Sequence, residues 1–169
     1  MEIINLDSKR LVEEIKHGKV DTLIDWIDRN KDRFYKIAWS YLCNHEDIKD
    51  VFQNTLIKVY GNIDTLKNIN YFETWYISIL INECRQSLRS RKKEIVQENI
   101  EFYDCHIDQY NFFQEISSID EIFKEAIILK YISGYSQKEI SRILDIPIGT
   151  VKSRIYRGLR ELEGLLKEV

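Results

Sequence analysis

The sequence predicts an all-α protein made of two small helical domains joined by a linker. A charged content of 31% together with a single Pro in 169 residues is typical of a helical protein. Apolar residues recur at helical spacing through most of the chain. Near the C-terminus, two such periodic segments are separated by a tight break, which describes a helix-turn-helix.

Three helices are expected in the first 61 residues. Residues 8–17 predict a short helix capped by Ser8, and residues 21–42 predict a longer one. The third helix has the most regular apolar stripe and is expected to end at Gly61 in a C-terminal cap. Its stripe consists of Ile48, Val51, Phe52, Thr55, Leu56, Val59 and Tyr60.

Residues 62–71 predict a loop, because they contain turn residues and little periodicity. A fourth helix is expected to follow from Phe72 to Arg89, with Trp75 in the core. Its end belongs to a strongly basic segment, since residues 85–93 hold five positive charges and no acid. Such a segment favours either contact with nucleic acid or a solvated helix end that suits the helix dipole.

An acidic stretch follows, because residues 94–121 hold eight acids and no Lys or Arg. Its aromatic residues have no sustained period, so the sequence predicts a linker over residues 94–115 between domains at 1–93 and 116–169. A helix capped by Ser118 is expected next, and it should end at Gly134.

The helix-turn-helix begins with Ser136 and Glu139, whose spacing predicts a capping box. Pro147 allows the second helix to begin only at or after that residue, and Asp145 before it tolerates a left-handed conformation. The apolar stripe predicted for the second helix is Val151, Ile155, Leu159, Leu162 and Leu166. Its outward side chains are predicted to be Ser153, Tyr156, Arg157 and Arg160.

This region is basic within an acidic chain. Residues 130–160 hold seven Lys or Arg and two acids, so the segment carries +5 while the whole chain carries −3. A local concentration of this kind indicates a surface for phosphate groups. An ordinary helix pair with a solvated basic face is the alternative.

Nothing in the sequence predicts an enzyme, a cofactor or a metal site. The three His residues are isolated, and the catalytic and phosphate-binding patterns HExxH, GxSxG and GxxxxGK are all absent from the sequence. No apolar run approaches the roughly 20 residues that span a bilayer, and the N-terminus lacks the order of a signal peptide. We therefore expect a cytoplasmic protein without direct membrane insertion.

Two groups of motifs resemble bacterial RNA polymerase sigma factors of the extracytoplasmic-function (ECF) class, within the sigma-70 family. The second domain contains IPIGTVKSR at residues 146–154. The first contains AWSYL at 38–42, DIKDVFQ at 47–53 and YFETW at 71–75. The resemblance covers roughly residues 20–93 and 117–167, with the motifs in the order that the family has.

The resemblance implies that the chain binds core RNA polymerase, recognises the −35 promoter element as duplex and opens the −10 element. Residues implied to bind core polymerase are Asp50, Gln53 and Asn54. Residues implied to hold −10 DNA are Asn62, Tyr71, Asn82, Arg85, Arg89 and Arg91. Residues implied to bind −35 DNA are Thr150, Lys152, Ser153, Arg154 and Arg157. The family commonly has an anti-sigma factor as a further partner, and such a factor can be membrane-bound.

Two other functions compete with this one. A free-standing helix-turn-helix regulator, with an N-terminal domain that binds a partner or ligand, would explain the basic segment 130–160 equally well. It would leave the pair Asp50 and Gln53 and the basic segment 85–93 unexplained. A helical adaptor that binds only proteins would explain neither basic segment.

Overall fold

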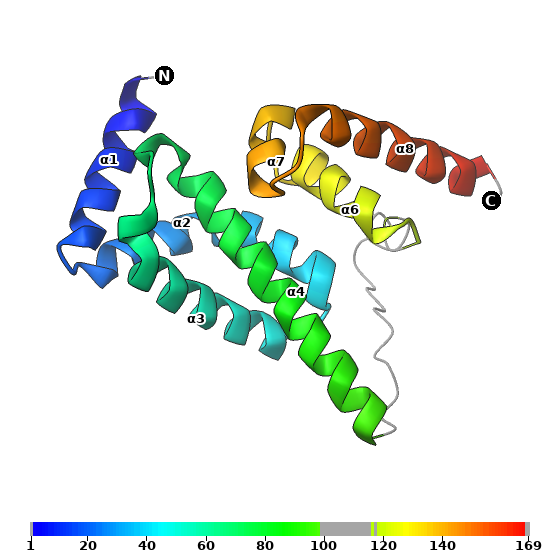
Figure 1. Cartoon of the computed structure of the whole chain (residues 1–169), viewed down its shortest axis with the longest axis horizontal. Helices are drawn as coiled ribbons and strands as arrows, with labels where there is room; N and C mark the ends of the chain where they lie inside the picture. Colours follow the sequence, from blue (N-terminus) through cyan, green and yellow to red (C-terminus); the bar gives the residue numbers. More distant parts are fainter. Residues whose placement is uncertain (1, 99–115, 117, 168–169) are drawn as a thin grey trace. The chain divides into compact units, whose positions relative to one another are not determined.

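The structure is a computed structural model that describes residues 2–98, 116 and 118–167, and the regular elements of these residues are all helical. The all-α prediction is therefore confirmed. The chain divides into two compact units, Met1–Ser87 and Leu88–Val169 (Figure 1). Among the described residues, no helix combines the length and the apolar character that crossing a bilayer requires.

The first unit is built from four helices and two short 3₁₀ turns, and its last helix continues past Ser87. The elements in order are α1 (Glu2–Lys16), α2 (Val20–Leu42), α3 (His45–Asn62), η1 (Ile63–Thr65), η2 (Ile69–Tyr71) and α4 (Phe72–Glu98). Gly18, with φ of 85°, turns the chain between α1 and α2. Asn44 begins α3 by accepting the backbone N–H groups of Glu46 and Asp47 at 2.8 and 3.1 Å.

Aromatic side chains join α2 to α4 in the core of this unit. The ring of Trp26 lies 5.0 Å from those of Phe72 and Tyr76, and 5.2 Å from that of Phe34. Edge-to-face and tilted pairs at these distances are favourable beyond the apolar area that they bury. Phe34, Phe72 and Tyr76 are each at most 2% exposed, so this cluster fixes α4 on the surface of α2.

Several boundaries in the first unit differ from those predicted. The first helix begins at Glu2, and α4 continues to Glu98 because residues 89–98 contain good helix formers and neither Gly nor Pro. The prediction that Gly61 caps the third helix is wrong. Gly61 lies inside α3, and the chain continues from Asn62 directly into η1, with Ile63 still in right-handed helical geometry.

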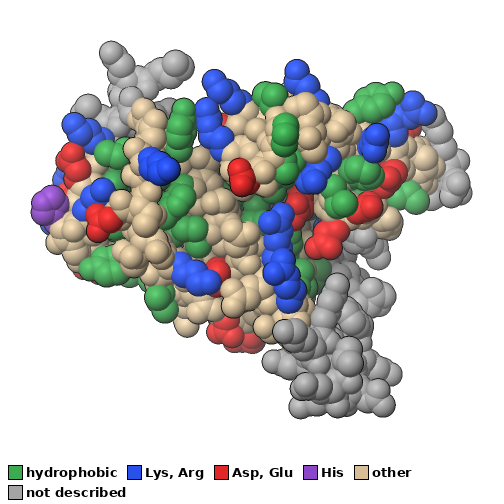
Figure 2. Space-filling view, viewed as in Figure 1, with side chains coloured by type: hydrophobic (Ala, Val, Ile, Leu, Met, Phe, Trp, Pro, Cys, Tyr) green, Lys and Arg blue, Asp and Glu red, His purple; other side chains and the backbone are tan. Residues whose placement is uncertain are grey.

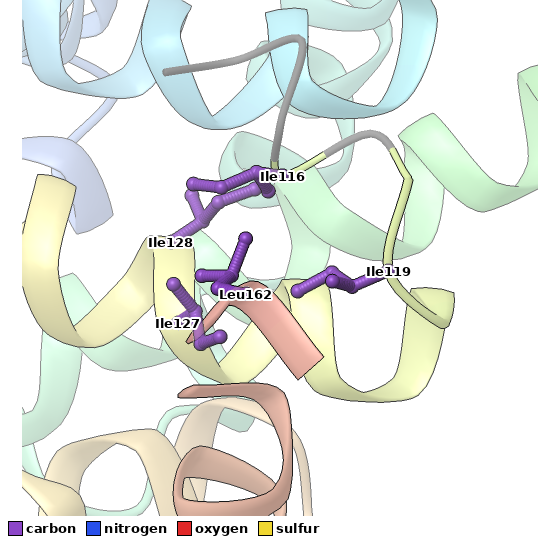
Figure 3. Close-up of a cluster of buried hydrophobic side chains, with 5 residues drawn as sticks. All are labelled: Ile116, Ile119, Ile127, Ile128 and Leu162. Carbon is purple, nitrogen blue, oxygen red and sulfur yellow. The ribbon is translucent and has the colours of Figure 1, made fainter. Parts of the chain in front are cut away.

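The second unit contains α6 (Glu121–Ile127), the π-helix η3 (Ile128–Ile132), α7 (Gln137–Ile143) and α8 (Ile148–Lys167). Its core cluster joins the chain before α6 to α6, η3 and α8 (Figure 3). The side chains of that cluster are Ile116, Ile119, Ile127, Ile128 and Leu162. The helix-turn-helix is thus supported by α6 packing along α8.

The local signals of the helix-turn-helix are confirmed. Ser136 and Glu139 form the reciprocal capping box at the start of α7. Gly134, with φ of 77°, ends the preceding helical segment, and Asp145 adopts a left-handed φ of 52° in the turn. The cap predicted for α6 is wrong, because Asp120 and not Ser118 accepts the Ile122 N–H, at 3.1 Å.

The buried stripe of α8 is also shifted from the predicted one. Val151, Ile155 and Leu162 are buried as expected, but Leu159 is 41% exposed. Gly158 takes its place in the contact with α6, where a Cβ atom would lie 2.6 Å from Ile127 Cδ1 and 2.9 Å from Phe123 Cβ. A Gly at this position lets the two helices approach closely, which periodicity of large apolar residues could not reveal.

Candidate nucleic-acid interface

The exposed face of α3 carries the residues predicted to bind polymerase. Asp50, Gln53 and Asn54 are all exposed. The opposite face packs into the unit and consists of Ile48, Val51, Thr55 and Val59. This buried set is narrower than the predicted stripe, because Phe52 and Leu56 are only half-buried and Tyr60 is 39% exposed.

A pocket of about 310 Å³ lies where the end of α3, η1 and the middle of α4 meet. Its lining residues are Lys58, Asn62, Thr65, Trp75, Ile79, Asn82 and Glu83. The structure therefore brings together Asn62 and Asn82, which lie 20 positions apart in the sequence and were both predicted to hold DNA. An indole, two amides, an ammonium and a carboxylate offer both a stacking surface and hydrogen-bonding groups.

An ion pair orders one wall of this pocket. Lys58 Nζ donates to Glu83 Oε1 at 2.5 Å, and the Glu83 side chain is only 7% exposed. A carboxylate so deeply buried needs such a partner, since an unpaired buried charge is costly. Lys58 also reaches Gln86 Oε1 at 3.4 Å, so α3 and α4 are tied together at the pocket.

The other predicted −10 residues lie outside the pocket lining. Arg85 donates to Asn82 Oδ1 at 3.5 Å and so adjoins the pocket rim. Tyr71 is the last residue of η2 and is 39% exposed. Arg89 is exposed and Arg91 half-buried, and both lie further along α4, past the boundary at Ser87.

Residues of the second predicted DNA surface lie in the first three turns of α8. Lys152, Ser153 and Arg157 are exposed, whereas Thr150 and Arg154 are half-buried. Figure 2 shows Lys and Arg side chains on the surface of α7 and α8. The face of α8 opposite Val151 and Ile155 thus presents positive and hydroxyl groups to solvent.

Sequence reasoning missed several residues at these surfaces. Trp75 was expected in the core but is half-buried and lines the pocket, beside Glu83 and Lys58. On α8, Tyr156 was correctly placed on the outer face but not assigned to DNA, although it is 62% exposed and accepts a bond from Arg160 at 3.3 Å. On α3, Ile57 is 68% exposed beside the polar residues. The position of Ile57 outside the predicted apolar stripe could have indicated from the sequence that it is exposed.

Two family models match this chain, and they match its two halves in order. Residues 26–94 match the model of sigma-70 region 2, and residues 114–162 match that of sigma-70, region 4. The first match contains the pocket and the exposed face of α3, and the second contains the helix-turn-helix.

This chain belongs to the sigma-70 family.

Its curated relatives place it in the ECF class. The ECF RNA polymerase sigma factor SigW of Bacillus subtilis is 29% identical, over 95% of this chain and 97% of its own length. The ECF RNA polymerase sigma-E factor of Haemophilus influenzae is 27% identical, over 96% of both chains. The protein is therefore a sigma factor, which acts with core RNA polymerase in promoter-specific transcription initiation.

Solved structures show the same architecture. The sigma factor RpoE from Bartonella quintana, crystallised with the anti-sigma factor NepR, superposes with a TM-score of 0.66 at 28% identity. That match covers 85% of this sigma factor and 97% of RpoE. CnrH, in complex with the cytosolic domain of CnrY, has the same fold with a TM-score of 0.75 at 21% identity, over 96% and 98% of the two chains. A free-standing regulator is not favoured, because it would not account for region 2.

Proposed function

We propose that the first unit of this sigma factor docks on core polymerase and captures the displaced −10 strand, and that the helix-turn-helix binds the −35 duplex. The pocket between α3, η1 and α4 is the observation that carries this proposal. It combines residues predicted to hold DNA with an aromatic wall, in the part of the chain that matches sigma-70 region 2. Residues 94–115, the predicted linker, mostly lie outside the described residues.

The pocket suits a base that has left the double helix. Its volume of about 310 Å³ is at the lower end of the roughly 300–1,000 Å³ of ligand pockets, so it can take a small planar group but no duplex. Trp75 offers a stacking surface, which is sequence-tolerant because every base has a π-face. Asn62 and Asn82 can bond the base edge that pairing would otherwise occupy.

Cations on α4 suit the phosphates of the same strand. Arg85 adjoins the pocket through Asn82, and Arg89 and Arg91 follow at intervals along α4. Because Arg85 and Arg89 are four residues apart, they are neighbours on the helix surface. We assign these arginines, with Tyr71 in η2, to the −10 strand.

The α8 surface suits the duplex. A helix fits the major groove of B-DNA with its N-terminal residues toward the bases. Lys152, Ser153 and Arg157 occupy this part of α8 and are exposed, and we add Tyr156 from the same face. Thr150 and Arg154 are half-buried and would contact DNA at the edge of this surface.

The exposed face of α3 is our proposed polymerase contact. Asp50, Gln53 and Asn54 are free of any role in the unit's core, because the helix buries its opposite face. Ile57 adds an apolar side chain to the same exposed side. Apolar groups ringed by polar ones are the usual composition of protein interfaces.

We also infer that this sigma factor has an anti-sigma partner and works in the cytoplasm without an enzymatic activity of its own. The inference of an inhibitor is supported by RpoE of Bartonella quintana, whose structure was solved with the anti-sigma factor NepR.

A transcription assay with purified core polymerase tests the proposal. Core alone should initiate poorly at a promoter that carries both elements, and adding the protein should direct initiation to one start site. In addition, the holoenzyme should bind single-stranded non-template −10 DNA better than the same sequence as duplex. Equal binding to both forms would show that the first unit docks on polymerase without holding an opened strand.

A further inference from the structure

The N-terminal helix α1 lies outside both family matches, which begin at residues 26 and 114. Its bounds are Glu2–Lys16, and it contacts α2 and both turns, η1 and η2, of the segment that joins α3 to α4 (Figure 1). This joining segment, residues 62–71, supplies Asn62 and Thr65 to the pocket. A helix that no matched domain includes thus supports one wall of the proposed −10 site.

The joining segment has little internal order of its own. Each 3₁₀ turn is three residues long, and its backbone bonds are local, such as Leu66 N to Ile63 O at 3.2 Å in η1 and Tyr71 N to Asn68 O at 3.0 Å in η2. Its side-chain bonds are equally local, such as Thr65 Oγ1 to Asn62 O at 2.7 Å. Turns this short do not persist by themselves, so their position depends on what packs against them.

α1 supplies such packing. It buries Leu11, Val12 and Ile15, which are 7%, 0% and 1% exposed, while Ile63 of η1 is 4% exposed. α1 lies against both turns, and its Lys16 Nζ lies 3.6 Å from Asp64 Oδ1 in η1. Asp64 stands between Ile63 and the pocket residue Thr65, so a shift of α1 would move η1 and change the pocket wall.

We propose that α1 is a positioning element for the −10 strand, which holds η1 and η2 so that the pocket is formed before DNA arrives. The proposal rests on the assignment of the pocket to −10 DNA. Preformed sites bind more tightly because less ordering remains to be done on binding. α1 itself need not touch DNA, and its effect is transmitted through residues 62–71.

Paired variants of the full chain test this proposal in complex with core polymerase. The probe is a single-stranded DNA oligonucleotide selected from a random pool by the wild-type holoenzyme. Val12→Ala loosens the buried stripe of α1, and Val51→Ala makes the same change at a valine of α3 that is 2% exposed. We expect Val12→Ala to weaken oligonucleotide binding about fivefold or more, in the range of ordinary coupling effects. Val51→Ala should lower thermal stability similarly but leave that affinity within about twofold.

Two substitutions of surface lysines provide a second test that does not depend on destabilising the core. Lys16→Glu repels Asp64, whereas Lys19→Glu makes the same charge change at a lysine that pairs with Glu14 of α1, at 3.5 Å. The two substitutions change the net charge by the same amount, so a loss of binding common to both reports general attraction for DNA phosphates. We expect oligonucleotide binding to fall more in Lys16→Glu than in Lys19→Glu. The conservative variant Lys16→Arg should bind the oligonucleotide as the wild type does. Core affinity should be equal in all these variants.

The outcomes separate the two proposals. If the wild-type holoenzyme does not prefer the single strand, the −10 assignment fails and the role of α1 fails with it. If the wild type shows that preference but Val12→Ala behaves like Val51→Ala, and Lys16→Glu like Lys19→Glu, the positioning role of α1 alone is overturned.

Discussion

Asp50 and Gln53 are single residues whose loss should affect binding and not folding. Both are exposed on α3, while the buried face of that helix is made by other residues. Replacing both by Ala should weaken association with core polymerase in an affinity titration. The melting temperature should hardly change, because surface substitutions usually alter stability by less than about 0.5 kcal/mol. Asp28→Ala, at an exposed position of α2, is the control, and an unaltered core affinity would remove α3 from the interface.

Arg154 and Arg157 are neighbours on α8, of which Arg157 is the more exposed. The double replacement by Ala should reduce −35 binding and promoter use. A lost contact with a base should cost roughly 1–3 kcal/mol and relax specificity at one position. A lost phosphate contact should instead weaken all sequences alike and make the salt dependence shallower. Binding measured across several salt concentrations and base substitutions distinguishes these cases, and unchanged promoter use would contradict both.

Tyr76 carries a buried hydroxyl with no hydrogen-bond partner among the described residues. Burial raises the pKa of this phenol well above its ordinary value of 10.0. Tyr76→Phe should raise the free energy of unfolding by about 1 kcal/mol, since an unsatisfied buried polar group is removed. Tyr131→Phe, at a side chain that is 55% exposed, should change it much less.

The same residue predicts a dependence on pH. Because the pKa of Tyr76 is higher in the folded chain, the unfolded chain ionises first as the pH rises above about 10. The wild type should therefore lose stability in that range, whereas Tyr76→Phe should lose less. Chemical denaturation at pH 9 to 11 would measure the free energy of unfolding of both proteins. If it fell equally with pH in both, the raised pKa of Tyr76 would be contradicted.

At the scale of elements, the contact between α6 and α8 depends on Gly158. A Cβ there would lie 2.9 Å from Phe123 Cβ, which belongs to the stem of its side chain and cannot move without its helix. Gly158→Ala should therefore lower stability, since overpacking costs about 1–3 kcal/mol. This outweighs the ~1 kcal/mol that Ala gains over Gly in a helix.

Gly164→Ala is the matched control on the same helix. No atom lies within 4 Å of a Cβ at Gly164, so only the helix preference remains and the substitution should be neutral or stabilising. The melting temperature should therefore fall in Gly158→Ala and stay unchanged or rise in Gly164→Ala. A stabilising Gly158→Ala would show that α6 and α8 do not need their close approach.

At the scale of the whole molecule, the proposal requires one polymerase to hold both proposed DNA-binding surfaces in a single initiation complex. Inserting about half a helical turn between the −35 and −10 sites turns one site to the opposite face of the duplex. We expect transcription to collapse on such a promoter, although each site still binds its own unit in isolation. Run-off transcription with a series of spacers measures this. Full activity on the altered promoter would contradict the use of both units on one promoter.

Local patterns in the sequence determined much of the architecture. The helical periods placed α2, α3 and α8, and the pattern of Ser136, Glu139 and Asp145 defined the helix-turn-helix. These features depend on near neighbours in the chain, so their physical cause is present in the sequence. Likewise, Asp50, Gln53, Ser153 and Arg157 were correctly expected on outer faces, because periodicity separates the two sides of a helix.

Only the tertiary structure decided where segments distant in sequence meet. The pocket joins Lys58 to Glu83 across 25 positions, and it makes Trp75 a wall residue although its spacing suggested the core. Gly158, and not Leu159, lies in the contact between α6 and α8, because two backbones can approach this closely only where no side chain separates them. The contact of α1 with η1 and η2 is of the same kind. Each of these contacts depends on packing between elements. The periodicity of apolar residues within one helix does not indicate which element packs against it.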